Sequence, residues 1–109
     1  MMFLSGGAPE ETVRMAASDD TAFGLTNALK YQDGTTSGRK AKKCTITIET
    51  NSARYCLGGA TPTDGASGLG HKVVDGDSIV LTSWKAIDTF KIINFTGGSN
   101  VVLQVTSEF

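Results

Sequence analysis

The sequence has little of the chemistry from which most active sites are built. Its 109 residues include one histidine, His71, and two cysteines, Cys44 and Cys56. Structural zinc sites need four ligands, so these three residues fall short of one. A cysteine–histidine nucleophile pair needs spatial proximity and an activated thiolate, and nothing in the sequence indicates either. We therefore expect no catalytic residues, no metal and no other cofactor.

Strong net charge and long apolar runs are also missing. Ten basic and eleven acidic residues leave a formal net charge of −1, which argues against a strongly basic nucleic-acid-binding protein and against an acidic tail. No apolar run reaches the roughly 18 residues that a membrane span requires. The opening Met-Met-Phe-Leu lacks the basic start and long apolar segment of a signal peptide. We expect neither nucleic acid nor a membrane as a partner.

Proline is scarce, with two residues, whereas glycine is abundant, with thirteen. Together with many threonines, valines and isoleucines, this composition favours short strands joined by tight turns. The length suits one domain, which on folding buries about 65% of the surface that the unfolded chain exposes. The composition therefore indicates a single all-β domain.

Period-two alternation of apolar and polar residues predicts strands in the C-terminal part of the chain. The predicted strands are residues 43–49, 53–57, 72–74, 78–82, 89–95 and 101–106. Residues 89–95 carry apolar side chains on both faces, so this strand should be central and covered on both sides. Asn51-Ser52 and Gly97 to Asn100 are predicted as hairpin turns, the first pairing residues 43–49 with 53–57. Several short strands separated by turns at these spacings predict an all-β, antiparallel sandwich or barrel, of which the sandwich is the favoured form.

The two sheets of this sandwich should bury one face of each strand. The predicted core consists of Ile46, Ile48, Tyr55, Leu57, Ile79, Leu81, Phe90, Ile92, Leu103 and Val105. Cys44 and Cys56 lie on strands expected to pair, so a disulfide is conceivable. Without a secretory signal, two reduced and buried thiols are the favoured interpretation.

The first twenty residues are predicted as an extended N-terminal arm, and residues 21–109 as a single β-sandwich domain. Residues 1–9 contain Gly6, Gly7 and Pro9 and show no sustained period. A short alternation follows at residues 12–15. Two interpretations remain open, an arm that lies on a partner and an arm folded onto its own domain. Residues 21–31 are ambiguous between a strand and a helical turn.

Three further segments are candidates for binding. Residues 39–43 place four positive charges at the entry to a strand, where they could dock to an acidic protein surface or form a solvated edge that prevents aggregation. Residues 58–70 form a long loop with five glycines. Asp64, Asp75 and Asp77 are possible calcium ligands, but Asp75-Gly76 is more typical of a turn.

The central block carries a pattern of strands and turns. It comprises Ile46 to Thr50, Ala53 to Thr63, Gly70-His71 and Gly76 to Leu81, followed by strands at Phe90 to Phe95 and Val101 to Thr106. This pattern resembles small structural proteins of tailed bacteriophages, over roughly the last two-thirds of the chain. The resemblance implies a capsid decoration, or cement, subunit with a β-sandwich or jelly-roll fold.

This resemblance implies a non-enzymatic virion protein on the capsid surface, assembled in the host cytoplasm. Its partner would be the major capsid protein, and the chain would form a dimer or trimer. The expected contacts are Met1, Met2, Phe3, Leu4, Arg39, Lys40, Lys42, Lys43, Pro62 and Asp64. The alternative is a module of the phage tail, head–tail junction or fibre, with Trp84 as a glycan contact beside Lys85 and Asp88.

Overall fold

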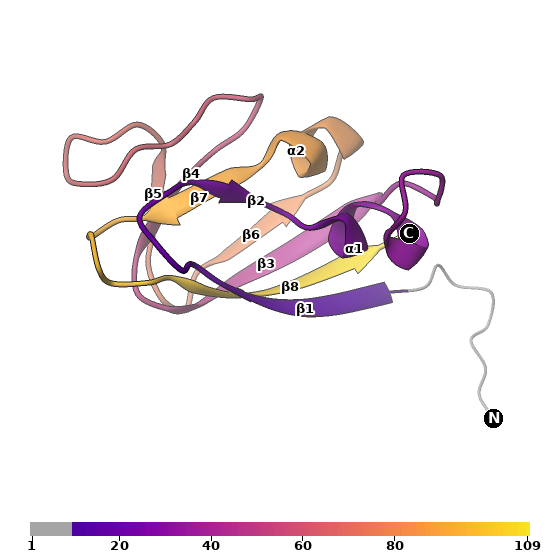
Figure 1. The fold of residues 1–109 in the computed structure, drawn as a ribbon, viewed down its shortest axis with the longest axis horizontal. Helices are drawn as coiled ribbons and strands as arrows, with labels where there is room; N and C mark the ends of the chain where they lie inside the picture. The colour runs from indigo at the N-terminus through magenta and orange to yellow at the C-terminus, as the bar shows by residue number, and fades with distance from the viewer. Residues whose placement is uncertain (1–9) are drawn as a thin grey trace.

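The structure, a computed structural model of the chain, describes residues 10–109. Two four-stranded antiparallel sheets face each other (Figure 1). The long sheet has the order β1 (Glu10–Ala16), β8 (Val102–Glu108), β3 (Lys43–Thr50), β6 (Ser78–Leu81). The short sheet has the order β2 (Phe23–Gly24), β7 (Lys91–Asn94), β4 (Ala53–Cys56), β5 (His71–Val73). The predicted all-β antiparallel sandwich is confirmed.

Three short helical elements gather at one end of the sandwich (Figure 1): α1 (Asn27–Lys30), the 3₁₀ turn η1 (Gln32–Gly34) and α2 (Trp84–Thr89). The ambiguous segment at residues 21–31 contains both of its alternatives, since β2 is followed directly by α1. Ser83 caps α2, because its hydroxyl accepts a hydrogen bond from the Ala86 N–H at 3.2 Å. No helix in the described part of the chain has the length and apolar character to cross a membrane.

The core lies between the two sheets and follows the alternation in the sequence. All but two of the predicted core side chains are buried. Tyr55 is half-buried and packs against the core. Leu57 is 45% exposed, which corrects its assignment, because β4 ends one residue earlier at Cys56. The prediction for β7 is confirmed, since it lies between β2 and β4 and buries both Ile92 and Ile93.

Both predicted hairpins are wrong. β3 pairs with β6 and β8, whereas β4 pairs with β5 and β7. Asn51, in the left-handed conformation with φ 66°, therefore begins a crossing between the sheets, and its side chain donates to the Asn100 carbonyl at 2.8 Å. Residues 97–100 likewise cross from β7 in the short sheet to β8 in the long one. Tight turns of this kind reverse the chain, but they do not specify which sheet receives the next strand.

Part of the predicted arm belongs to the sandwich. β1 pairs with β8 along its whole length, from Glu10 opposite Glu108 to Ala16 opposite Val102. Its apolar residues Val13 and Met15 are half-buried against the core. The short alternation at residues 12–15 thus supplies an inner face, so for residues 10–16 the second interpretation holds, and this part of the arm folds onto its own domain as a strand. Residues 1–9 lie outside the described residues.

The strand pairs are nested along the chain. β4 pairs with β5, β3 with β6, β2 with β7 and β1 with β8. Among the described strands, β4 and β5 are the only consecutive ones that pair, and the long segment 57–70 joins them. The chain therefore winds as one long hairpin whose two arms fold over together.

Candidate functional site

The basic stretch, residues 39–43, leads into β3 at the end of the sandwich that carries the helices (Figure 1). Ala41 is buried, and its N–H donates to the Lys30 carbonyl at 2.9 Å. The Lys42 N–H donates to the Glu108 carbonyl at 2.8 Å. Arg39, Lys40, Lys42 and Lys43 are exposed. The backbone is therefore fixed to the domain while four cationic side chains remain at the surface.

Neighbouring groups engage two of these cations. Lys43 Nζ lies 4.0 Å from the Glu108 carboxylate, and Lys40 Nζ lies 5.2 Å from the centroid of the Trp84 ring. Within residues 10–109, neither Arg39 nor Lys42 has a carboxylate within 4.0 Å. Exposed ion pairs and cation–π contacts contribute little energy, so none of the four is committed to holding the fold together.

Trp84 and Lys40 belong to one cluster, although their sequence positions gave no indication of it. Tyr31 completes it: its ring centroid lies 5.1 Å from that of Trp84, and its backbone pairs with Lys40 in an isolated antiparallel bridge. Trp84 is half-buried, and Lys40 lies over its ring. The ring therefore packs against neighbouring side chains, and the face below Lys40 is not open to a sugar.

The loop at residues 58–70 is held over the short sheet by Arg54 of β4. The guanidinium donates to three loop carbonyls, from Nε to Gly65 at 2.9 Å, from Nη1 to Gly70 at 2.8 Å and from Nη2 to Ala66 at 3.1 Å. Its carbon Cζ also lies 5.0 Å from the Phe95 ring centroid. Sequence reasoning did not identify this role, because an arginine on the outer face of a strand is normally solvated.

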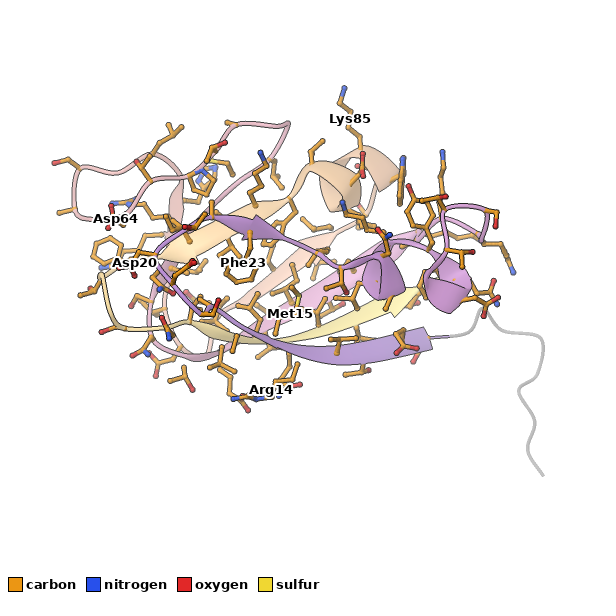
Figure 2. The ribbon with its side chains drawn as sticks, in the orientation of Figure 1. Arg14, Met15, Asp20, Phe23, Asp64 and Lys85 are labelled. Atoms are coloured by element: carbon orange, nitrogen blue, oxygen red, sulfur yellow. The ribbon has the colours of Figure 1, made fainter. Side chains whose placement is uncertain are left out.

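The two residues predicted as contacts in this loop have different surroundings. Pro62 is fully buried, so its ring is not part of the surface that the loop presents, which corrects that prediction. Asp64 is exposed (Figure 2). The Gly65 N–H donates to the Phe95 carbonyl at 2.9 Å, beyond the end of β7 that lies away from the helices. The part of the loop around Asp64 therefore lies away from the basic stretch, whereas the Gly58 N–H at the start of the loop donates to the Thr89 hydroxyl of α2 at 3.2 Å. Met1, Met2, Phe3 and Leu4 lie outside the described residues.

Cys56 and His71 both line one open cavity of about 350 Å³ beside β4 and β5, whereas Cys44 lies in the other sheet. Both cysteines are free and buried, as predicted for small apolar side chains, with Cys44 in the long sheet and Cys56 in the short one. Burial raises the pKa of the Cys44 thiol. His71 lies opposite Tyr55 with the ring centroids 5.4 Å apart, so it shares the face of Tyr55. Cys56, one residue later in β4, projects to the other face.

A buried amide joins the connections at the end of the sandwich opposite the helices. Asn94 is fully buried, and its Oδ1 accepts the Val101 N–H at 2.8 Å. Its Nδ2 lies 3.2 Å from Asp20 Oδ1 and 3.1 Å from Asn100 Oδ1. Asp20 Oδ1 also accepts the Gly98 N–H at 3.0 Å. The network links the β1–β2 connection to the β7–β8 connection, and it is structural in character.

Acid should weaken this network through Asp20. The hydrogen bond from the Gly98 N–H, and then that from Asn94, lower the pKa of the Asp20 carboxyl from its ordinary 3.8. The stability that Asp20 supplies is therefore complete above the unfolded pKa and is lost as pH falls through the folded pKa. We expect urea unfolding of Asp20→Asn to show a shallower loss of stability with acid than the wild type. Equal slopes would contradict this role.

Within residues 10–109, no group of three or more histidine, cysteine, aspartate or glutamate side chains is arranged to hold a metal ion. The Asp75 to Asp77 segment forms a turn in which Asp77 Oδ2 accepts the Val74 N–H at 2.8 Å.

No protein-family model matches the chain, and no match was found among curated proteins or among solved structures. The strand pairing and the surfaces described above are therefore what indicates a function for the chain.

Proposed function

We propose that the chain is a non-enzymatic virion structural protein that decorates a capsid. In this role it binds the outer surface of the major capsid protein shell and stabilises the shell. The observation that carries the proposal is the nested strand pairing, from β4–β5 outward to β1–β8. Eight antiparallel strands in two sheets with this pairing support a jelly roll, a fold that recurs in viral capsid proteins and in lectins.

A fold hosts many functions, so the surface has to carry the specific role. A decoration subunit needs a rigid body and one contact surface that is repeated many times. The loop tied down by Arg54 and the connections joined by Asn94 supply rigidity. Four cations on a fixed backbone supply a contact surface in which only the side chains, and not the backbone, lose conformational entropy on binding. Weak individual contacts become strong when many copies bind one shell.

The basic stretch should dock to an acidic region of the capsid. We expect the double variant Lys40→Glu/Lys42→Glu to raise the dissociation constant for shells by about tenfold or more at low salt, because both charges then repel the acidic partner. The measurement is co-sedimentation of the purified chain with shells that lack it. The matched control is Lys72→Glu/Lys91→Glu, which changes the net charge equally on the short sheet. Equal loss in both variants would contradict a specific docking surface.

The alternative, a module of the tail, the head–tail junction or a fibre, is supported by one cluster. Tyr31 and Trp84 form a half-buried aromatic pair 5.1 Å apart at the helical end. Glycan sites use such aromatic surfaces, and jelly rolls include lectins. The position of Lys40 over the Trp84 ring favours protein docking over sugar stacking. Decoration of the capsid surface therefore remains the leading proposal.

A further inference from the structure

β1 forms a long and open edge of the sandwich. It has seven residues, whereas the other outermost strands, β6, β2 and β5, have four, two and three. No strand among residues 10–109 pairs with its outer side. It contains neither proline nor glycine, and its pairing with β8 has no register shift. Proteins usually shield such edges with short strands, prolines, bulges, covering elements or charged side chains, and of these β1 has only the charges of Glu10, Glu11 and Arg14.

Backbone groups on this side of β1 have no hydrogen-bond partner among residues 10–109. The Ala17 N–H donates to the Val101 carbonyl at 3.0 Å, toward β8. Because the direction of these groups alternates along an antiparallel strand, Glu10, Thr12, Arg14 and Ala16 direct theirs away from β8. Thr12 lies opposite Thr106, and their hydroxyls are 2.9 Å apart. Side chains approach most closely in antiparallel pairs that exchange no backbone hydrogen bonds, so this contact agrees with a Thr12 backbone that points away from β8. The edge is therefore ready to accept a further strand.

Apolar groups lie open beside the same edge. A cavity of about 360 Å³ is lined by residues 15–19, residues 21–24 and Thr26. Met15 of β1 and Phe23 of β2 are half-buried there, in the space between the two sheets (Figure 2). The core is thus incompletely covered where β1 and β2 form the side of the sandwich. An element added along β1 would remove part of this apolar surface from water.

We propose that β1 pairs antiparallel with β1 of a second copy about a twofold axis, joining the two long sheets into one of eight strands. In this register Thr12 faces Thr12 of the second copy, and Glu10 faces Arg14. The inner faces of both sheets stay aligned, and the two apolar cavities lie on the same side of the joint sheet. This inference does not depend on the proposed function.

Charge selects the second copy as the occupant and fixes the register. Glu10 and Arg14 lie on the same face of β1, two residues to either side of Thr12, so one twofold axis forms two opposite-charge pairs. Sliding the strands by one step of two residues places Glu11 opposite Glu11, which is repulsive. Sliding them the other way leaves Glu10 opposite Ala16. The strand is therefore electrostatically self-complementary in one register.

Sedimentation equilibrium of the full chain tests the pairing. We expect the wild type to dimerise and Arg14→Glu to raise the dimer dissociation constant about tenfold or more. The double variant Glu10→Arg/Arg14→Glu exchanges the two charges, and we expect it to return the dissociation constant to the wild-type value. The control is Glu49→Gln, because Arg14 also lies 4.0 Å from Glu49 within the chain. A wild type that stays monomeric overturns the proposal and leaves the edge to a strand of another protein. A dimer insensitive to Arg14→Glu also overturns it.

A cysteine at the twofold axis gives an independent readout. Both native cysteines are buried, so an introduced thiol on the surface is the one available for crosslinking. We expect Thr12→Cys to form a disulfide-linked dimer under mild oxidation, since facing residues of paired strands are within disulfide reach. Thr47→Cys, an exposed threonine of β3 inside the same sheet, is the control. Equal crosslinking of the two variants overturns the proposal.

Discussion

Replacing Asn94 with leucine is expected to lower the free energy of unfolding by about 2–4 kcal/mol. Leucine has as many side-chain heavy atoms as asparagine but is larger, so no cavity forms, and the loss comes from the hydrogen bonds together with some crowding of the buried site. The buried Val101 N–H loses its acceptor at 2.8 Å, and Asp20 and Asn100 lose their shared donor. A buried donor without an acceptor retains its full cost of removal from water.

Urea denaturation measures this loss, with Asn27→Ala as the control. Asn27 is an exposed asparagine at the start of α1. Its replacement should change the free energy of unfolding by less than about 0.5 kcal/mol. If Asn94→Leu were as mild as the control, the network would not be what joins the two connections at this end.

Replacing Arg54 with alanine is expected to release the loop at residues 58–70. Three carbonyls lose a charged donor, which should cost about 2–3 kcal/mol after allowance for partial exposure. Arg54→Lys should rescue little, because an ammonium group cannot reproduce the planar fork of a guanidinium. The loop contains no lysine or arginine, so subtilisin is a suitable probe where trypsin is not. Nicking within residues 58–70 should accelerate about tenfold or more.

The control for Arg54 is Lys72→Ala. Lys72 is the other cation over the Phe95 ring, with Nζ 4.3 Å from its centroid. The Lys72→Ala substitution removes this cation–π contact, but the three loop carbonyls keep their hydrogen bonds from Arg54. Mass spectrometry of the products locates the nick. Cleavage rates that rise equally in both variants would show that Phe95 packing, rather than Arg54, holds the loop in place.

The sequence was informative where one face of a strand is buried. Ile46 and Ile48 of β3, and Leu103 and Val105 of β8, alternate with polar residues, and each is fully buried. This pattern depends only on local period, so strands and core could be predicted. β1 was harder, because Val13 and Met15 are only half-buried at an edge and their alternation is short.

Strand pairing could not be predicted in the same way. Consecutive strands usually pair, and a short turn such as Asn51-Ser52 usually marks a hairpin. Here the chain crosses between sheets at that turn, and the partners of β3 are the distant β6 and β8. Nothing local distinguishes a turn within a sheet from a turn between sheets. The pairing is decided by how both sheets close over a shared core.

The candidate binding surfaces could also be predicted only where they depend on local sequence. The exposed basic stretch is readable because charges at a strand entry stay in solvent. Its neighbours Tyr31 and Trp84 are far apart in the sequence, and only the folded chain brings their rings into contact. Pro62 was misjudged because a proline in a glycine-rich loop normally lies at the surface, whereas Arg54 draws this loop down onto the sheet.

Fractionation of native particles tests the central claim most directly. Lysate from the source is separated on a density gradient, and each fraction is probed for this chain. Capsid decoration predicts that the chain migrates with intact heads, including heads that lack tails. Detection only with tailed particles or free tails would contradict decoration and favour the tail module. Detection only as a small soluble species would contradict any role in the virion.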